Sequence, residues 1–291
     1  MDKYISISSL ITIVLFSITS LAQAPIQDIN YTENIETVQI NPVDDPLGDP
    51  FLVLGDKNSK LLLSFDLFGK EYETFEYTFI HCDADWIPTT DLIPSEYIDG
   101  YYEDFINDYE YSLNTKQDYI HYRLIFPSNK MTITKSGNYI LKVYPEDHPE
   151  NIAFTRRIMV FEPLVNIGGI VKKTSDPSRK LLDQEVEFKV NISNLGSQFP
   201  SRELRIFIRQ NGRWSTMIKD LQPLSITNGV MDYNLQKGNV FKGTNRYRYF
   251  DFTSQKYNSE YIQKYVENKF SEKVIYLQLE EIYNNILENN I

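Results

Sequence analysis

The sequence contains few of the residues that build covalent or metal-bound scaffolds. Its 291 residues include one cysteine and three histidines. A single cysteine excludes an internal disulfide and any cysteine-rich zinc site. Positive charge is also scarce, because 29 lysines and arginines stand against 40 aspartates and glutamates, which leaves a net charge of −11. This balance disfavours nucleic acids and anionic lipid surfaces as main partners.

Long apolar runs are missing beyond the N-terminal segment. No later stretch approaches the roughly 18 apolar residues that a membrane-spanning helix needs, so we predict no direct membrane insertion by the mature chain. Aromatic residues, in contrast, make up 14% of the chain, with 21 tyrosines and 17 phenylalanines. They argue against disorder and suit the pleated, half-buried surface of a sheet. The composition therefore favours a folded, β-rich protein.

The first residues have the pattern of an export signal. Lys3 is followed by an apolar stretch over residues 5–21 and by small residues at Ala22 and Ala24. This order is typical of a secretory signal peptide. We predict residues 1–22 as that signal, with cleavage after Ala22 or Ala24, and an uncleaved membrane anchor is the alternative.

Short apolar runs separated by turn residues occupy residues 23–162. In one of them strict alternation places Phe75, Tyr77 and Phe79 on a single face. Many short strands with turn signals between them are the pattern of a β-sandwich, which we expect to close before Pro163. The strands predicted in this domain are 37–40, 51–54, 61–67, 74–81, 118–126, 138–144 and 154–161.

A second β-sandwich is predicted over residues 163–255. Asn211-Gly212 is a strong hairpin signal, and one strand alternates as a half-exposed antiparallel strand does. The buried face of that strand is expected to carry Val186, Phe188 and Val190. The strands predicted here are 165–171, 185–192, 203–209, 230–235 and 246–252.

Residues 256–291 change character. Their apolar residues recur at spacings near three and four, which predicts an amphipathic helix. The sequence as a whole thus predicts an all-β fold of two immunoglobulin-like antiparallel β-sandwich domains with a C-terminal α-helical tail.

One segment gathers chemically active side chains: His81-Cys82-Asp83-Ala84-Asp85-Trp86. Neighbouring strand residues point to opposite faces, so His81 and Cys82 cannot both bind one metal from a regular strand. His121 could join His81, but zinc usually takes three or four nitrogen or sulfur ligands. We therefore predict a structural segment, in which Asp83 and Asp85 cap a turn and Trp86 packs beneath it.

No pattern of a catalytic centre stands out. The chain has no Gly-x-Ser-x-Gly nucleophile elbow and no glycine-rich phosphate loop. Carboxylates are so numerous that their closeness in sequence says nothing about a glycosidase pair. We predict a protein that is not an enzyme and has neither a cofactor nor a metal; a hydrolase using acidic residues is the least supported alternative.

Two further segments could form an interface. Tyrosine is a good interface anchor, and Tyr97, Tyr101 and Tyr102 lie among acidic residues, so this stretch is either a recognition loop or a loop folded onto the sandwich. Arg205 and Arg209 would share one face of a predicted strand. That face is either solvated or binds an acidic partner.

Several motifs together resemble a known family. They are His81–Trp86, Ser95–Tyr101, Tyr119–Tyr122, Ser136–Tyr139, the doublet Arg156-Arg157 before Met159-Val160, and Arg246–Asp251. In this order they resemble the type IX secretion system plug proteins of Gram-negative bacteria, over about residues 25–262. The resemblance implies no catalytic role for the signature positions in these motifs. These positions are His81, Cys82, Asp83, Asp85, Trp86, His121, Arg156 and Arg157.

The resemblance implies a periplasmic, non-enzymatic accessory protein. Such a plug associates with the outer-membrane translocon barrel and closes its periplasmic opening. Family members usually continue into a further β-rich region, whereas this chain turns to the predicted helical tail. The alternative is a periplasmic or surface carbohydrate-binding module with a stacking platform of Trp86, Tyr101 and Tyr102. Burial of these aromatic rings would favour the plug.

Overall fold

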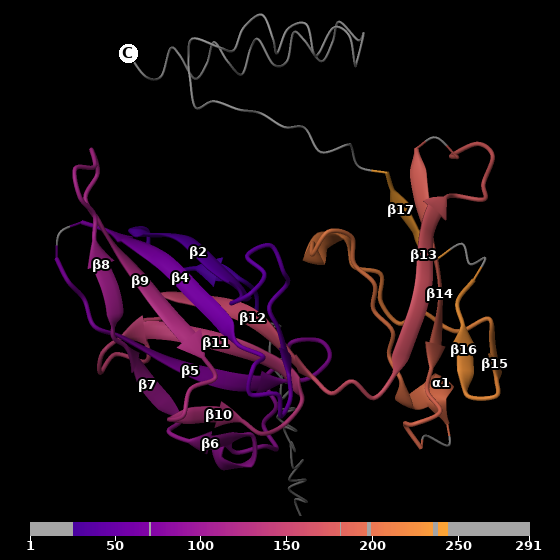
Figure 1. Cartoon of the computed structure of the whole chain (residues 1–291), viewed down its shortest axis with the longest axis horizontal. Coiled ribbons are helices and arrows are strands. Elements are labelled where there is room, and N and C mark those ends of the chain that lie inside the picture. Colours follow the sequence, from indigo (N-terminus) through magenta and orange to yellow (C-terminus); the bar gives the residue numbers. More distant parts are fainter. Residues whose placement is uncertain (1–25, 70, 181, 197–198, 235–237, 244–291) are drawn as a thin grey trace, which may run out of the picture. The chain divides into compact units, whose positions relative to one another are not determined.

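The computed structural model describes residues 26–69, 71–180, 182–196, 199–234 and 238–243 (Figure 1). The predicted signal peptide, the predicted strand 246–252 and the predicted helical tail lie outside these residues. Contacts divide the described chain into two compact units. Among the described residues, one unit takes 26–169 together with 188–234, and the other takes 170–187 together with 238–243.

Two sheets, antiparallel except for one strand, face each other in the first unit (Figure 1). The larger has the order β1-β12-β11-β5-β7, with β3 parallel to β12, and the smaller has the order β2-β4-β9-β8. The bounds in the larger sheet are β1 Ile29–Asn30, β12 Phe154–Phe161, β11 Gly137–Pro145, β5 Phe75–Cys82, β7 Glu103–Ile106 and β3 Phe51–Val53. Those in the smaller sheet are β2 Ile35–Pro42, β4 Leu61–Phe68, β9 Tyr119–Phe126 and β8 Asp108–Tyr111.

The remaining strands form two further sheets. A two-stranded sheet pairs β10 with β6, and a five-stranded sheet has the order β13-β14-β16-β15, with β17 pairing β14. Their bounds are β6 Ile98–Gly100, β10 Met131–Ile133, β13 Asn166–Lys173, β14 Asp183–Asn191, β15 Ser225–Thr227, β16 Val230–Asp232 and β17 Val240–Lys242. Three short helical turns are η1 Pro94–Glu96, α1 Pro200–Glu203 and η2 Trp214–Thr216. The prediction of an all-β protein is confirmed for the described residues.

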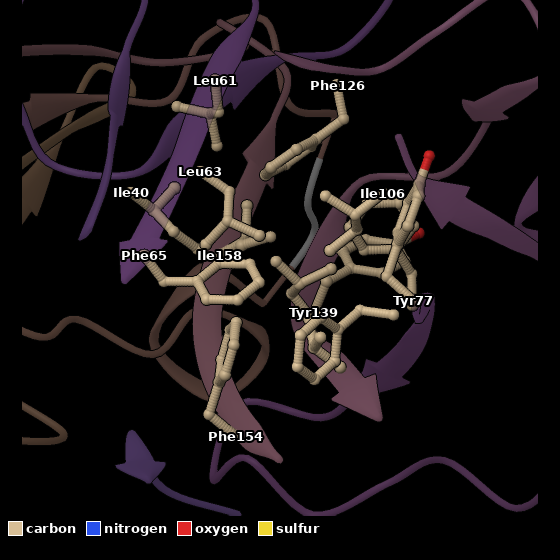
Figure 2. Close-up of a cluster of buried hydrophobic side chains, with 14 of the residues drawn as sticks. Ile40, Leu61, Leu63, Phe65, Tyr77, Ile106, Phe126, Tyr139, Phe154 and Ile158 are labelled. Carbon is tan, nitrogen blue, oxygen red and sulfur yellow. The ribbon is translucent and has the colours of Figure 1, made fainter. Parts of the chain in front are cut away.

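Aromatic rings fill the space between the two facing sheets. Phe65 of β4 stacks on Tyr122 of β9 with ring centroids 4.9 Å apart. Phe65 also meets Phe154 of β12 edge-on, with ring centroids 5.0 Å apart (Figure 2). The alternation predicted for β5 is confirmed, because Phe75, Tyr77 and Phe79 are all buried. One strand face is apolar because it closes this core.

The second unit is smaller among the described residues. β17 pairs with the first half of β14, and the buried Asp183 carboxylate pairs with the Nε of Arg179 at 2.5 Å. The predicted alternation of β14 is correct only in its second half, where Phe188 and Val190 are buried. In the first half the buried positions are Asp183 and Glu185, so the alternation is offset by one residue from that of the second half. Val186 is therefore only half-buried, and the neighbouring Glu185 is buried instead.

The predicted strand 203–209 is wrong. Its first residue ends α1, and the rest of the stretch forms no ladder except an isolated bridge between Ile208 and Ile218. The chain does reverse at Asn211-Gly212, as predicted, with φ values of 52° and 68°. Apart from the backbone hydrogen bonds of the bridge between Ile208 and Ile218 and one from Leu221 N–H to Ile206 O, side-chain contacts hold this segment.

Gly137 opens β11 against the ring of His81. A Cβ at this position would lie 2.4 Å from His81 Nε2, and its φ of +153° disfavours other residues. We expect Gly137→Ala to lower the free energy of unfolding by about 1–3 kcal/mol, because the core has no room to move the buried ring. Urea denaturation measures this loss.

Gly168 is the matched control for that substitution. A Cβ there would meet nothing within 4 Å. We expect Gly168→Ala to change the free energy of unfolding by no more than about 0.5 kcal/mol. Equal losses in the two variants would show that the contact with His81 is not what excludes a side chain at residue 137.

Candidate functional site

The turn after β5 is held by a single aspartate. Asp83 Oδ1 accepts hydrogen bonds from the backbone N–H groups of Asp85 (2.8 Å) and Ile87 (3.0 Å). Trp86 has a left-handed φ of 66°, and its N–H donates to Asp83 O. Asp83 therefore caps the turn as expected from the sequence, whereas Asp85 directs its carboxylate elsewhere.

His81 and Cys82 are occupied by structural contacts. His81 Nδ1 lies 2.9 Å from Thr89 Oγ1, and its ring packs against Tyr97 and Tyr139. Burial lowers the pKa of His81 and raises the pKa of the Cys82 thiol to about 12. A thiol with so high a pKa is a poor nucleophile. Within the described residues, no group of three or more His, Cys, Asp or Glu side chains could hold a metal.

Tryptophan and arginine side chains stack beside this turn. The Arg157 guanidinium lies 4.9 Å from the ring centroid of Trp86 and 4.7 Å from that of Trp214. Arg209 lies over Trp214 as well, at 4.3 Å. Trp86 is only 4% exposed. Alternating cations and aromatic faces attract each other, so this ladder fastens the segment 205–216 to the turn.

An ion-pair cluster continues the same contact. Arg205 binds both carboxylate oxygens of Asp85, at 2.7 and 3.2 Å, and both oxygens of Asp220, at 2.6 and 3.0 Å. Arg209 Nη2 lies 3.2 Å from Asp49 Oδ2. The acidic partners of these two arginines thus lie in the same chain.

The arginine doublet fixes the segment that precedes β2. Arg157 donates from Nε and Nη2 to Ile26 O, at 2.9 and 2.7 Å, while Ile26 N–H donates to Trp86 O. Arg156 Nη1 donates to Ile29 O at 3.3 Å. The turn, the doublet and the segment 205–216 are therefore parts of one contact network.

Comparison with known proteins places part of this network in a family. The family described as "Type 9 secretion system plug protein 1st domain" matches residues 35–162. Residues 35–162 belong to the type 9 secretion system plug family. The matched domain contains the capped turn, the arginine doublet and both facing sheets except β1. The resemblance inferred from the sequence motifs is thus confirmed for residues 35–162.

A solved structure is similar to the plug domain and to residues beyond it. It is described as a hypothetical protein from Parabacteroides merdae ATCC 43184, with 33% sequence identity and a TM-score of 0.76. The match covers 81% of this chain and 59% of that protein, so the chain spans about three fifths of its length. Among curated proteins none matches the chain.

The other predicted residues lie outside the ladder. Tyr97 is buried against His81 in the plug domain, which leaves it little surface for a partner, whereas Tyr101 and Tyr102 are exposed. His121 pairs with Asp66 at 2.6 Å on the smaller sheet. The stacking platform proposed for a carbohydrate cannot include Trp86, because its ring is buried.

Trp214 is the residue that the sequence reasoning missed. It connects Arg157 of the plug domain to Arg209, and its ring meets Trp86 edge-on at 5.1 Å. Two signals pointed to it. It is one of only two tryptophans in the chain, and it comes shortly after the Asn-Gly hairpin.

The Arg205 cluster predicts a pH-dependent contribution to stability. The hydrogen bond from Arg205 lowers the pKa of Asp85 below its usual value. A carboxyl whose folded pKa is lowered stabilises the fold above its unfolded pKa and loses this effect as pH falls through the folded value. We expect Arg205→Ala to destabilise the protein slightly at pH 7, because exposed ion pairs are screened by solvent.

Acid titration checks this prediction. The difference in melting temperature between wild type and Arg205→Ala should shrink once pH falls below about 4, where aspartate begins to protonate. Arg202 is exposed, and Arg202→Ala is the control, with no such pH dependence expected. A difference that stays constant down to about pH 2.5 would show that the contact does not depend on the Asp85 charge.

Proposed function

We propose that this chain is a non-enzymatic accessory protein of type IX secretion that closes the periplasmic opening of the outer-membrane translocon barrel. The match of residues 35–162 to the plug family carries this proposal. A plug domain implies association with a secretion translocon, and the barrel is the partner that we propose. Closure would be reversible, with secreted cargo competing for the opening.

The chemistry of the signature segment supports a binding role. His81, Cys82 and Asp83 are held in structural contacts, and Asp85 and Trp86 bind side chains of the same chain. A reversible interface is expected to be broad and partly polar, since obligate interfaces are the apolar ones. By the criterion of aromatic burial, Trp86 favours the plug over a carbohydrate-binding module, whereas the exposed Tyr101 and Tyr102 do not separate the two.

We also propose a periplasmic location, reached through cleavage of the signal peptide at residues 1–22. No helix among the described residues has the length and apolar character needed to cross a bilayer. The domain division that we propose is 23–162 and 163–255, each an immunoglobulin-like sandwich, followed by a helical tail at 256–291.

Purification from the native envelope tests the proposed function. A tagged chain expressed at its natural level should co-purify with the translocon barrel, identified by mass spectrometry, more strongly when secreted cargo is depleted. Cells lacking the chain should become permeable to large antibiotics, and the full chain should restore the barrier. Normal permeability in the deletion strain, together with no barrel in the purified material, would overturn the proposal.

A further inference from the structure

One continuous segment, the ribbon over residues 99–111, supplies an edge strand to each of the two facing sheets of the plug domain. β7 is the last strand of the larger sheet, β8 is the last strand of the smaller one, and only Asn107 separates them. Among the described residues no strand pairs with the outer side of β8, which lies at the edge of its sheet beside β9 (Figure 1). An unpaired edge strand presents a row of main-chain donors and acceptors.

The opposite edge of the smaller sheet is blocked by its backbone, whereas β8 is not. β2 has a bulge between Glu36 and Gln39, a left-handed residue at Thr37, and a proline at position 42. Bulges and prolines are the usual means of preventing edge-to-edge pairing. All four residues of β8, Asp-Tyr-Glu-Tyr, are exposed, and the strand has neither a bulge nor a proline. Its protection is its short length and its two carboxylates, Asp108 and Glu110, which repel acidic strands. The edge at β8 therefore stays open to a strand that carries basic side chains.

The register of β8 determines what its free side offers. Ser112 N–H donates to Tyr119 O, so Ser112 and Tyr119 are a hydrogen-bonded pair. Such pairs alternate along an antiparallel ladder, so the main chains of Asp108 and Glu110 also bond to β9. The main-chain groups of Tyr109 and Tyr111 therefore point away from β9, toward the open edge. Their rings pack on each other at 5.8 Å, and Tyr72 covers Tyr109 at 4.6 Å, which forms an aromatic shelf on one face.

Acidic side chains occupy the other face of β8. The ribbon over residues 99–111 contains five carboxylates, five aromatic residues and no lysine, arginine or histidine. Arg123 binds Asp108 and Glu110, and Lys130 pairs with Asp104 at 3.5 Å. Two cations thus form ion pairs with three of the five carboxylates, and Lys142 interacts electrostatically with Glu103. Five carboxylates against three cations leave the ribbon with an excess of negative charge.

We infer that β8 is a docking edge for an extended segment of a partner protein in which basic and apolar residues alternate. The segment would add a strand beside β8, with apolar side chains over the tyrosine shelf and lysines or arginines beside Asp108 and Glu110. A second copy of the chain is disfavoured, because pairing β8 with β8 would bring like charges together. Docking at β8 concerns the plug domain itself and does not depend on the proposed closure of the barrel.

Binding of a synthetic peptide to the full chain tests the inference. The probe is a fluorescein-labelled decapeptide of alternating lysine and valine. Its controls are a peptide of the same composition with lysines and valines in separate blocks, and an alternating glutamate–valine peptide. We expect the alternating basic peptide to bind at least about tenfold more tightly than either control, and to bind more weakly in high salt. Equal binding of all three peptides would overturn the inference.

A matched pair of substitutions separates strand addition from simple charge attraction. Tyr111→Ala removes a ring but keeps the outward N–H, whereas Tyr111→Pro removes both, and proline is tolerated at an edge where the N–H faces solvent. We expect Tyr111→Pro to weaken peptide binding about tenfold more than Tyr111→Ala, as the loss of a main-chain hydrogen bond would. Identical affinities of the two variants would contradict strand addition.

Two further measurements keep the test decisive. If Tyr111→Pro does not fold, Glu110→Lys replaces it. The Glu110→Lys variant should bind the basic peptide more weakly and the glutamate–valine peptide more tightly than the wild type does. An unchanged preference for the basic peptide would overturn the inference.

Sedimentation of the unliganded chain measures whether a second copy of the chain occupies the edge. Dimerisation that is abolished by Glu110→Lys or by Tyr111→Pro would assign the edge to a second copy and overturn the inference.

Discussion

Replacing Trp86 by alanine should destabilise the plug domain more than any other change at the turn. The ring is 4% exposed and is packed against Arg157 and Trp214. Removal of a buried aromatic ring leaves a cavity and should lower the free energy of unfolding by about 3–5 kcal/mol. Alanine and tryptophan are both strained at the left-handed φ of 66°. The backbone strain is therefore similar in the two proteins, and the loss of stability measures the contribution of the ring.

Urea denaturation followed by circular dichroism measures this loss, because Trp86 itself would contribute to a fluorescence signal. Trp86→Phe is the control, since it retains an aromatic face for Arg157, and it should recover more than half of the loss. A loss below about 1 kcal/mol for Trp86→Ala would mean that the ring is not a structural support of the turn.

Replacing Phe65 by alanine should have an effect of similar size in the centre of the sandwich. Phe65 is fully buried between the two sheets and contacts Phe75, Tyr122 and Phe154. We expect the free energy of unfolding to fall by about 3–5 kcal/mol, because three rings lose their common neighbour and cannot collapse into the space.

Phe68 lies on the same strand and provides the matched control. It is 40% exposed, and Phe68→Ala should cost less than about 1 kcal/mol. Both variants should keep the wild-type dependence of stability on urea, since neither changes the surface exposed on unfolding by much. Similar losses in the two variants would show that Phe65 is not at the centre of the core.

The predicted strands were most reliable where one face of a strand is buried. The alternation at Phe75, Tyr77 and Phe79 follows from local sequence alone, because a sheet with one face in the core imposes a period of two. The same pattern failed at residues 203–209. Arg205 and Arg209 do alternate with apolar residues, but a strand also needs a neighbouring strand, which local sequence does not specify.

The edge strands β7 and β8 escaped prediction for a related reason. Aspartate and glutamate are depleted in strands, and the ribbon over residues 99–111 is rich in both. It becomes strand only because β5 and β9 supply partners from distant parts of the chain. Pairing across the sheets therefore outweighs the local preference of these residues.

The sequence by itself determined the β-rich class, the family resemblance and the structural character of the turn capped by Asp83. The β-rich class follows from composition and period, the capped turn follows from neighbouring residues, and the resemblance follows from the order of several motifs. Only the tertiary structure decided that Trp86, Arg157, Trp214 and Arg209 form one ladder. Stacking and ion pairing need side chains within a few ångströms of each other, and folding alone brings residues so far apart in sequence to that distance.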